Sequence, residues 1–137
     1  MQKIYLIGFI LSLLNLLDAA EMSIDISEKI DISSDNIEIK EGRIEFIDNV
    51  IFQSKSYEVS GEVAEYYRGI DLIKIQGSPV EFSITSEGNN FNGFSNMILI
   101  KKNEIEISGN VLIEDSSSRI RGEKVKFDLN SGKLQVN

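Results

Sequence analysis

The chain has 137 residues, which is enough for one domain with a core of ordinary size. It contains no cysteine and no histidine, so disulfide and thiolate chemistry are excluded and the commonest general base and metal ligand are missing. A formal net charge of -8 makes nucleic acid a poor partner, because the phosphate backbone would be repelled. We therefore expect a domain that is stabilised by packing and backbone hydrogen bonds and uses no cofactor and no metal.

The first 20 residues are typical of a secretory signal peptide. Lys3 supplies the positive charge of the N-terminal region, and an apolar run follows from 4 to 17. Ala19 and Ala20 are small residues of the kind found at a cleavage site. The run of 14 residues is shorter than the roughly 20 needed to span a bilayer, which disfavours a retained anchor. We expect cleavage before Glu21, a periplasmic location and a mature domain of residues 21–137. Cleavage after Ala19 is the alternative position, because Asp18 fits the small-residue pattern poorly. An uncleaved membrane anchor is the alternative.

After this segment, apolar residues alternate with polar ones at a period of two, which predicts β-strands with one apolar and one charged face. The first four alternations occupy residues 24–26, 30–32, 37–39 and 44–46, and each has an acidic residue between two apolar ones. The segment 62–68 (EVAEYYR) is the one place where a helical turn competes, and its alternation favours a strand. The pattern therefore predicts an all-β protein.

Three longer segments share one design: an alternation, a break of Gly, Asn, Asp or Ser, and a second alternation. This pattern is typical of two short strands that meet at a turn or a bend. The three segments are 43–53, 72–83 and 104–114. Turns are predicted from Gly, Asn, Ser, Asp and Pro at 40–42, 77–79, 86–92, 115–118 and 130–132. Short strands at such regular spacing predict a sandwich, barrel or stacked roll.

A longer repeat lies over the short one. A shift of the chain by 61 residues places 11 residues on identical residues without a gap, from Ser34 on Ser95 to Glu62 on Glu123. Conservative matches continue as far as Ile75 on Val136. We interpret this as an internal duplication of a multi-strand unit within one domain.

Several short motifs follow one another in a recognisable order. They are an I-x-I-x-S-D segment at 30–35, G-x-P-[AV]-x-F at 77–82, a G-N-V turn at 109–111, I-x-G-[DE]-x-[IV]-x-[FY] at 120–127 and S-G-x-[LM]-x-[VA] at 131–136. In this order and spacing, residues 29–137 resemble the OstA-like, or LptA, family of periplasmic lipopolysaccharide-transport proteins. The chain departs from the family pattern at 47–50, where Ile-Asp-Asn-Val replaces the first G-N-V turn.

The resemblance implies a twisted β-jelly roll or sandwich of repeated antiparallel strands with an open apolar groove. It implies a carrier that binds the lipid A acyl chains of lipopolysaccharide and passes this lipid from the inner to the outer membrane. The alternation nominates the groove lining: Ile30, Ile32, Ile37, Ile39, Ile44, Phe46, Val50, Phe52, Phe82, Ile98, Ile100, Ile105, Ile107, Val111, Ile113 and Phe127. Matching to the family motifs makes Ile30, Ile32 and Phe82 the first candidates for lipid contact. An ordinary sandwich core is the alternative for each of them.

The same resemblance implies partners. Lipopolysaccharide is the first, and inner- and outer-membrane components with similar β-jelly-roll domains are the others. The first strand, with Ile24 and Ile26, and the last strand, with Leu134 and Val136, are expected to leave unpaired backbone groups at opposite ends of the sheet. A head-to-tail homo-oligomer follows from such edges. Six basic residues lie close together in the sequence and are candidates to bind head-group phosphates: Lys101, Lys102, Arg119, Arg121, Lys124 and Lys126. The alternative is that they are solvated residues on strand faces and edges.

Three other functions are weighed against transport. An enzyme would need paired carboxylates such as Glu45 and Glu106, but the sequence has no nucleophile motif and predicts no catalytic residues. An inner-membrane-anchored sister component of the same transport system would retain the N-terminal segment. An exported structural β-roll would have a closed core and bind no lipid.

Overall fold

The computed structural model describes residues 19–137, so the predicted signal peptide lies outside the described residues except for its last two positions. Ten strands and one short 3-10 turn make up this part of the chain. They are β1 (Ala20–Ile26), β2 (Glu28–Ser34), β3 (Asn36–Lys40), β4 (Arg43–Ser54), β5 (Tyr57–Tyr67), η1 (Arg68–Ile70), β6 (Leu72–Ser86), β7 (Asn89–Ile100), β8 (Glu104–Glu114), β9 (Arg119–Asp128) and β10 (Leu134–Val136). Over this range, no helix has the length and hydrophobicity that a membrane crossing requires.

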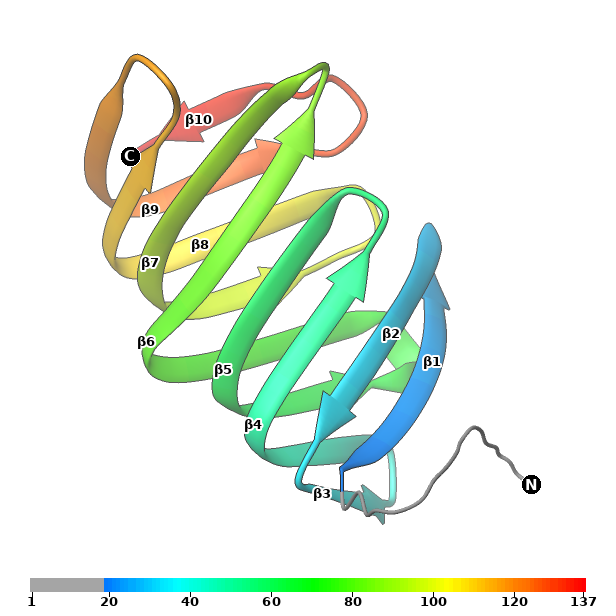
Figure 1. The fold of residues 1–137 in the computed structure, drawn as a ribbon. Coiled ribbons are helices and arrows are strands. Elements are labelled where there is room, and N and C mark those ends of the chain that lie inside the picture. Colours follow the sequence, from blue (N-terminus) through cyan, green and yellow to red (C-terminus); the bar gives the residue numbers. More distant parts are fainter. Residues whose placement is uncertain (1–18) are drawn as a thin grey trace.

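All ten strands belong to one antiparallel sheet. The order is β1-β2-β4-β5-β6-β7-β8-β9-β10, with β3 paired to β4 off this path (Figure 1). Almost every strand therefore pairs with its neighbours along the chain, as the repeated alternations predict. The all-β prediction is confirmed. Residues 62–67 of the ambiguous segment 62–68 lie within β5, and Arg68 begins the 3-10 turn η1.

The long strands bend near their middle. The pairing register shifts at five places, at Ile47/Val50, Ser60/Val63, Gln76/Val80, Phe94/Met97 and Ser108/Val111. Such bulges insert extra residues into a strand and bend it. Asp48 and Asn49 in β4, and Gly109 and Asn110 in β8, take positive φ values of 64°, 52°, 82° and 50°. The G-N-V motif is therefore a bend inside one strand.

The predicted turn at 77–79 is wrong, because these residues form the bend of β6 and include a cis Ser78-Pro79 peptide bond. The other predicted turns are confirmed. Gly42 and Gly88 have φ values of 79° and 81° in the tight turns before β4 and β7. Two longer connections, after β8 and after β9, contain 115–118 and 130–132.

The bends divide the strands into two layers. Layer A contains β1, β2, the second halves of β4, β6 and β8, and the first halves of β5, β7 and β9; layer B contains β3, the remaining halves and β10. The apolar faces of the layers meet. Phe46 and Phe52 come from the two halves of β4, and their rings are edge to face with centroids 5.7 Å apart. The result is the predicted twisted roll (Figure 1).

Backbone features recur at the 61-residue interval seen in the sequence. The bulge that follows Ile47 in β4 recurs after Ser108 in β8. Ser34 and Ser95 are the buried polar residues of the described chain. Each hydroxyl donates to the carbonyl two residues further on, at 2.8 and 3.2 Å. The interval therefore marks equivalent positions in the backbone as well as in the sequence.

Candidate functional site

The interior between the two layers contains most of the predicted lining residues. Fourteen of the sixteen have exposed fractions of 5% or less and belong to one apolar cluster: Ile30, Ile32, Ile44, Phe46, Val50, Phe52, Phe82, Ile98, Ile100, Ile105, Ile107, Val111, Ile113 and Phe127. The sheet does not close into a barrel, but these side chains fill the space between its layers. Phe91 of layer A and Phe127 of layer B, for example, are edge to face at 6.0 Å.

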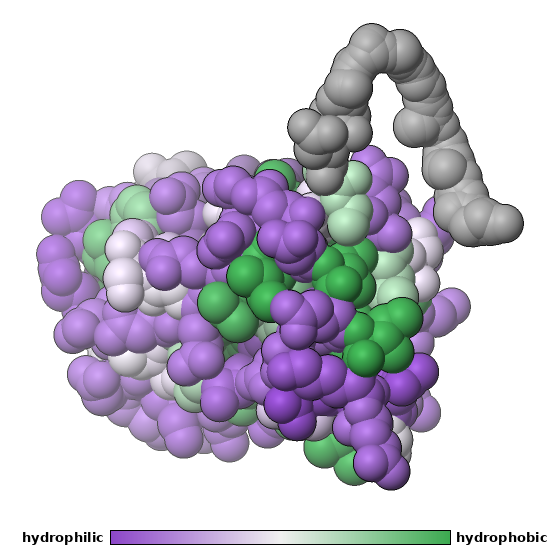
Figure 2. All heavy atoms as spheres, turned by 90° about the horizontal axis from the view of Figure 1, so that it is seen from below, coloured by the Kyte–Doolittle hydropathy of each residue, from purple (hydrophilic) through white to green (hydrophobic). Residues whose placement is uncertain are grey.

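Ile37 and Ile39 in β3 differ from the other predicted lining residues. Ile39 pairs with the buried Ile44 and therefore lies on the inner face, yet it is 69% exposed. Ile39 is therefore an inward-facing residue that the interior does not enclose, because β3 is an edge strand and its end is left uncovered. Its role in lining a groove stays a prediction. Ile37 is partly buried, as are Met22 and Ile24 of β1. Figure 2 shows hydrophobic side chains gathered on this end, which we call the N-terminal end.

Sequence reasoning missed part of the interior. β5, β6 and β9 contribute further buried residues: Tyr57, Val59, Ala64, Tyr66, Ile73, Ile75, Val80, Ile84 and Val125. The alternation signal was present, since Val59 pairs with Phe82 and Ile75 pairs with Ile98. The interior therefore runs through every strand from β1, with Ile26, to β10, with the partly buried Leu134.

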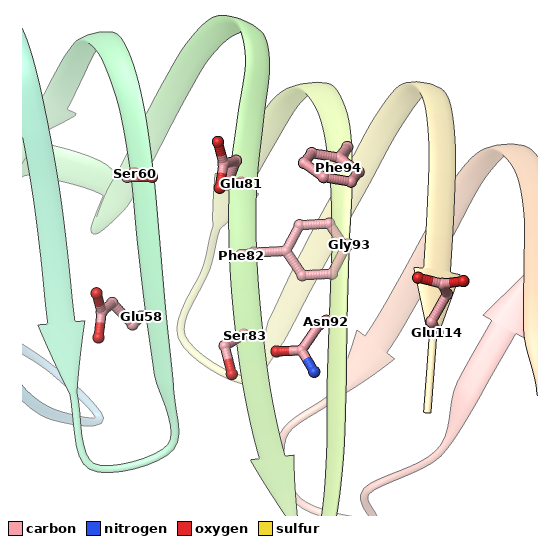
Figure 3. Close-up of a pocket in the computed structure, with 9 residues that line it drawn as sticks. All are labelled: Glu58, Ser60, Glu81, Phe82, Ser83, Asn92, Gly93, Phe94 and Glu114. Atoms are coloured by element: carbon pink, nitrogen blue, oxygen red, sulfur yellow. The ribbon is translucent and has the colours of Figure 1, made fainter. Parts of the chain in front are cut away.

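Gly93 in β7 leaves the space that the Phe82 ring occupies. The two residues are paired across β6 and β7, and a Cβ on Gly93 would lie 2.7 Å from Phe82 Cζ and 1.9 Å from the carbonyl oxygen of Leu112. Figure 3 shows the ring directed at Gly93. Only glycine fits at this point of the sheet, a constraint that the alternation does not reveal.

A shallow depression of about 360 Å³ lies on the outer face of layer A (Figure 3). Glu58, Ser60, Glu81, Phe82, Ser83, Asn92, Gly93, Phe94 and Glu114 line it. Phe94 is 42% exposed here, and the Glu114 carboxylate accepts from Arg119 at 2.7 Å. Within residues 19–137, no three acidic side chains come close enough together to hold a metal ion.

The six predicted head-group residues do not form one basic patch. Arg119 and Arg121 belong to the layer A half of β9, whereas Lys124 and Lys126 belong to its layer B half. Lys101, near the turn between β7 and β8, lies 3.4 Å from Glu106, and Lys124 lies 3.9 Å from the same carboxylate. Adjacent Lys102 is exposed in that turn. The bend in β9 thus separates charges that are close in sequence.

Glu45 and Glu106 are equivalent at the 61-residue interval, and each forms ion pairs with basic side chains. Hydrogen bonds from Lys40, at 3.0 Å, and Arg43, at 2.9 Å, hold the pKa of the Glu45 carboxyl below its usual range. A general acid requires a raised pKa instead. The surroundings of Glu45 are those of a solvated ion pair on a strand face.

These carboxylates predict a loss of stability in acid. Glu45, Asp115 and Asp128 have lowered pKa values in the folded protein, the last two through backbone N–H donors in their turns. Their stabilisation is present above the unfolded pKa values of 4.5 and 3.8, and is lost as pH falls through the lower folded values. We expect the melting temperature to decrease as the pH is lowered from about 5 to 3. Glu45→Gln should show a smaller decrease; a profile parallel to that of the wild type would contradict this.

Comparison with known proteins supports the fold. No protein-family model matches the chain, and no curated protein matches it in sequence. Among solved structures, it is similar to LptH from Pseudomonas aeruginosa, the LptA homologous periplasmic component of the conserved lipopolysaccharide transport device. The TM-score is 0.71 at 13% sequence identity, over 82% of this chain and 85% of that chain. The chain has the LptA-like fold. The twisted β-jelly roll that the sequence motifs imply is thereby confirmed.

Proposed function

We propose that the protein is a periplasmic carrier that binds the lipid A acyl chains of lipopolysaccharide and passes this lipid from the inner to the outer membrane. The observation that carries the proposal is an LptA-like roll whose inner face is apolar along its whole length. Burying each acyl CH₂ stabilises a complex by about 0.8 kcal/mol, so such an interior needs no dedicated polar contacts to bind long chains. Head-group sugars and phosphates would stay in water at the rim.

Acyl chains enter this interior by replacing contacts between the layers. The side chains of layer A and layer B now fill the space, as the Phe91 and Phe127 rings illustrate. On the long side opposite the bends, the hairpin turns of the two layers face each other (Figure 1). The Ser27 hydroxyl in the turn between β1 and β2 donates to the carbonyl of Lys102 in the turn between β7 and β8. Lipid entry along this side requires that contact to open.

Site-specific photo-crosslinking tests the proposal. A photoreactive phenylalanine analogue is placed at Ile32 or Phe82, which are 2% and 5% exposed on the inner face, and the cells are irradiated. We expect adducts with lipopolysaccharide at both positions. Phe94 is the matched control, because it neighbours Phe82 on the paired strand but lies on the outer face, and it should give no adduct. Absence of adducts at both inner positions in folded, exported protein would leave the structural β-roll as the better function.

Export by a cleaved signal peptide is part of the proposal. β1 begins at Ala20, so cleavage before Glu21 would remove a single residue of the first strand. N-terminal sequencing of the mature protein distinguishes this from the membrane-anchored sister component. A mature chain that begins at Ala20 or Glu21 fits the carrier, and a retained N-terminal segment fits the anchored component.

Head-to-tail assembly would extend the interior from one molecule to the next. Among residues 19–137, β1 and β3 are the unpaired edges of layers A and B at the N-terminal end. At the opposite, C-terminal end, the unpaired edges are the first half of β9 and β10. Ile39 and Val136 lie on the inner face of layer B at these two ends and are 69% and 44% exposed. Strand addition would pair the edges and cover both residues. Membrane components with similar β-jelly-roll domains would dock in the same way.

A further inference from the structure

Tyr57 carries an unpartnered polar group in the interior. The residue is 4% exposed, and its hydroxyl is the one buried side-chain oxygen or nitrogen without a hydrogen-bond partner in the described chain. It pairs with Ile84 across β5 and β6 and alternates with Val59, so it lies on the inner face of layer A. Buried tyrosine hydroxyls usually have a partner, because an unmade hydrogen bond inside a protein is costly. The buried serines Ser34 and Ser95, by contrast, each donate to a backbone carbonyl.

The phenol lies near the long side opposite the bends, because Tyr57 is the first residue of β5 after the turn between β4 and β5. Its polar neighbours are Glu28, whose charge raises the pKa of the phenol, and Ser54, whose hydroxyl lies close enough to lower that pKa but does not reach hydrogen-bond geometry with the phenol oxygen. Ser54 is occupied, because its hydroxyl is directed at the Glu28 carboxylate and at the Lys29 carbonyl, 2.9 Å away. Glu28 also accepts from the backbone N–H and the hydroxyl of Ser56, both at 3.1 Å. These groups bind one another, and the Tyr57 hydroxyl beneath them is left as a free donor.

The phenol remains a donor under physiological conditions. Burial, assisted by the negative charge of Glu28, raises the pKa of Tyr57 far above its usual value, so the hydroxyl keeps its proton. A phenol O–H can donate one hydrogen bond. A ligand that places an acceptor here would satisfy it without disturbing the apolar contacts deeper in the interior.

We propose that Tyr57 anchors bound acyl amphiphiles by donating a hydrogen bond to the ester or amide carbonyl at the head of an acyl chain. The inference rests on the proposed function, since it takes the methylenes of that chain to lie between the layers. The carbonyl is the first polar group after the methylenes, so it would stop at the rim where the phenol lies. The head group beyond it stays in water. Tyr57 would thus favour carbonyl-linked chains over chains attached through an ether.

Two detergents with matched chains test the anchor. Sucrose monolaurate and dodecyl maltoside both carry a chain of the same length on a disaccharide, but only the first has an ester carbonyl. Their affinities for the mature protein and for Tyr57→Phe are measured by calorimetry below the micelle concentration. We expect Tyr57→Phe to bind sucrose monolaurate about three- to tenfold more weakly and to bind dodecyl maltoside unchanged. The ligand-free variant should melt at the same temperature or a few degrees higher, because a costly unpaired hydroxyl is removed.

Tyr66→Phe is the matched control. Tyr66 is another buried inner-face tyrosine, 9% exposed in layer B, and its variant should bind both detergents like the wild type. If the wild type binds neither detergent, acyl binding fails and the anchor fails with it. If both detergents bind and Tyr57→Phe weakens neither or both equally, the anchor is wrong while acyl binding stands. A clearly lower melting temperature for Tyr57→Phe would show that the hydroxyl serves the fold, and would also overturn the anchor.

Discussion

Replacement of Gly93 by alanine is expected to lower the free energy of unfolding by about 3 kcal/mol or more. The new Cβ would lie 1.9 Å from the carbonyl oxygen of Leu112, a distance that no pair of non-bonded atoms tolerates. That oxygen belongs to the backbone of β8, so it cannot rotate away as a side chain would. Relief requires β7 and β8 to separate at a point where Gly93 is also paired with Phe82 and Ile113. The Phe82 ring, 2.7 Å from the same Cβ, would be displaced as well.

Chemical denaturation followed by circular dichroism measures this effect. Gly69→Ala in η1 is the matched control, because a Cβ there would meet no atom within 4 Å. It should change stability by less than about 0.5 kcal/mol. If Gly93→Ala were as stable as the control, the close approach of β7 and β8 would be contradicted. Because the substitution acts beside Phe82, it should also abolish photo-crosslinking at that position.

Deletion of Leu134 to Asn137 is expected to abolish head-to-tail association and to leave a folded monomer. The deletion removes β10, whose three pairs with β9 and the exposed Val136 form the layer B edge of the C-terminal end. The new edge would be the second half of β9, where Lys124 and Lys126 lie, and charged residues on an edge disfavour strand addition. The core should survive, because Leu134 is only partly buried.

Light scattering over a range of concentrations measures association, and circular dichroism verifies folding. Phe94→Ser is the control, because it removes a similarly exposed hydrophobic residue, 42% against 44%, from the outer face and away from both ends. It should associate like the wild type. Unchanged association of the shortened chain would exclude β10 as the contact.

The fold was largely predictable because period-two alternation reports directly which residues face inward. Val50, Phe52 and Ile107 were assigned correctly on that basis alone, and the breaks between alternations located every bulge in β4, β6 and β8. Whether a break is a turn or a bend depends on the pairing partner. The segment 77–79 consists of Gly, Ser and Pro, which are typical of turns, so its sequence predicts a turn where the structure has a bend within β6.

The candidate site was less predictable, because burial depends on what lies opposite a strand. Ile39 has the same alternation as Ile44, but one is 69% exposed and the other 3%. Only the position of β3 at an edge explains the difference. The basic residues of β9 are close in sequence, which predicts one basic group, but the bend in β9 places two of them in layer A and two in layer B. Tyr57 could be recognised as inward-facing from its alternation with Val59, whereas the absence of a hydrogen-bond partner depends on neighbours from β2 and β4.

The row of bulges has a mechanical consequence. Because each long strand contributes one half to each layer, the strand-pairing hydrogen bonds run within layer A or within layer B, and the bends are the main covalent connection between them. Moving the layers apart therefore breaks none of these ladders. It rotates the backbone at a line of hinges, several of which already hold left-handed residues such as Asn49 and Asn110. The resistance to widening comes chiefly from contacts between core side chains, which are the contacts that a bound hydrocarbon chain would replace.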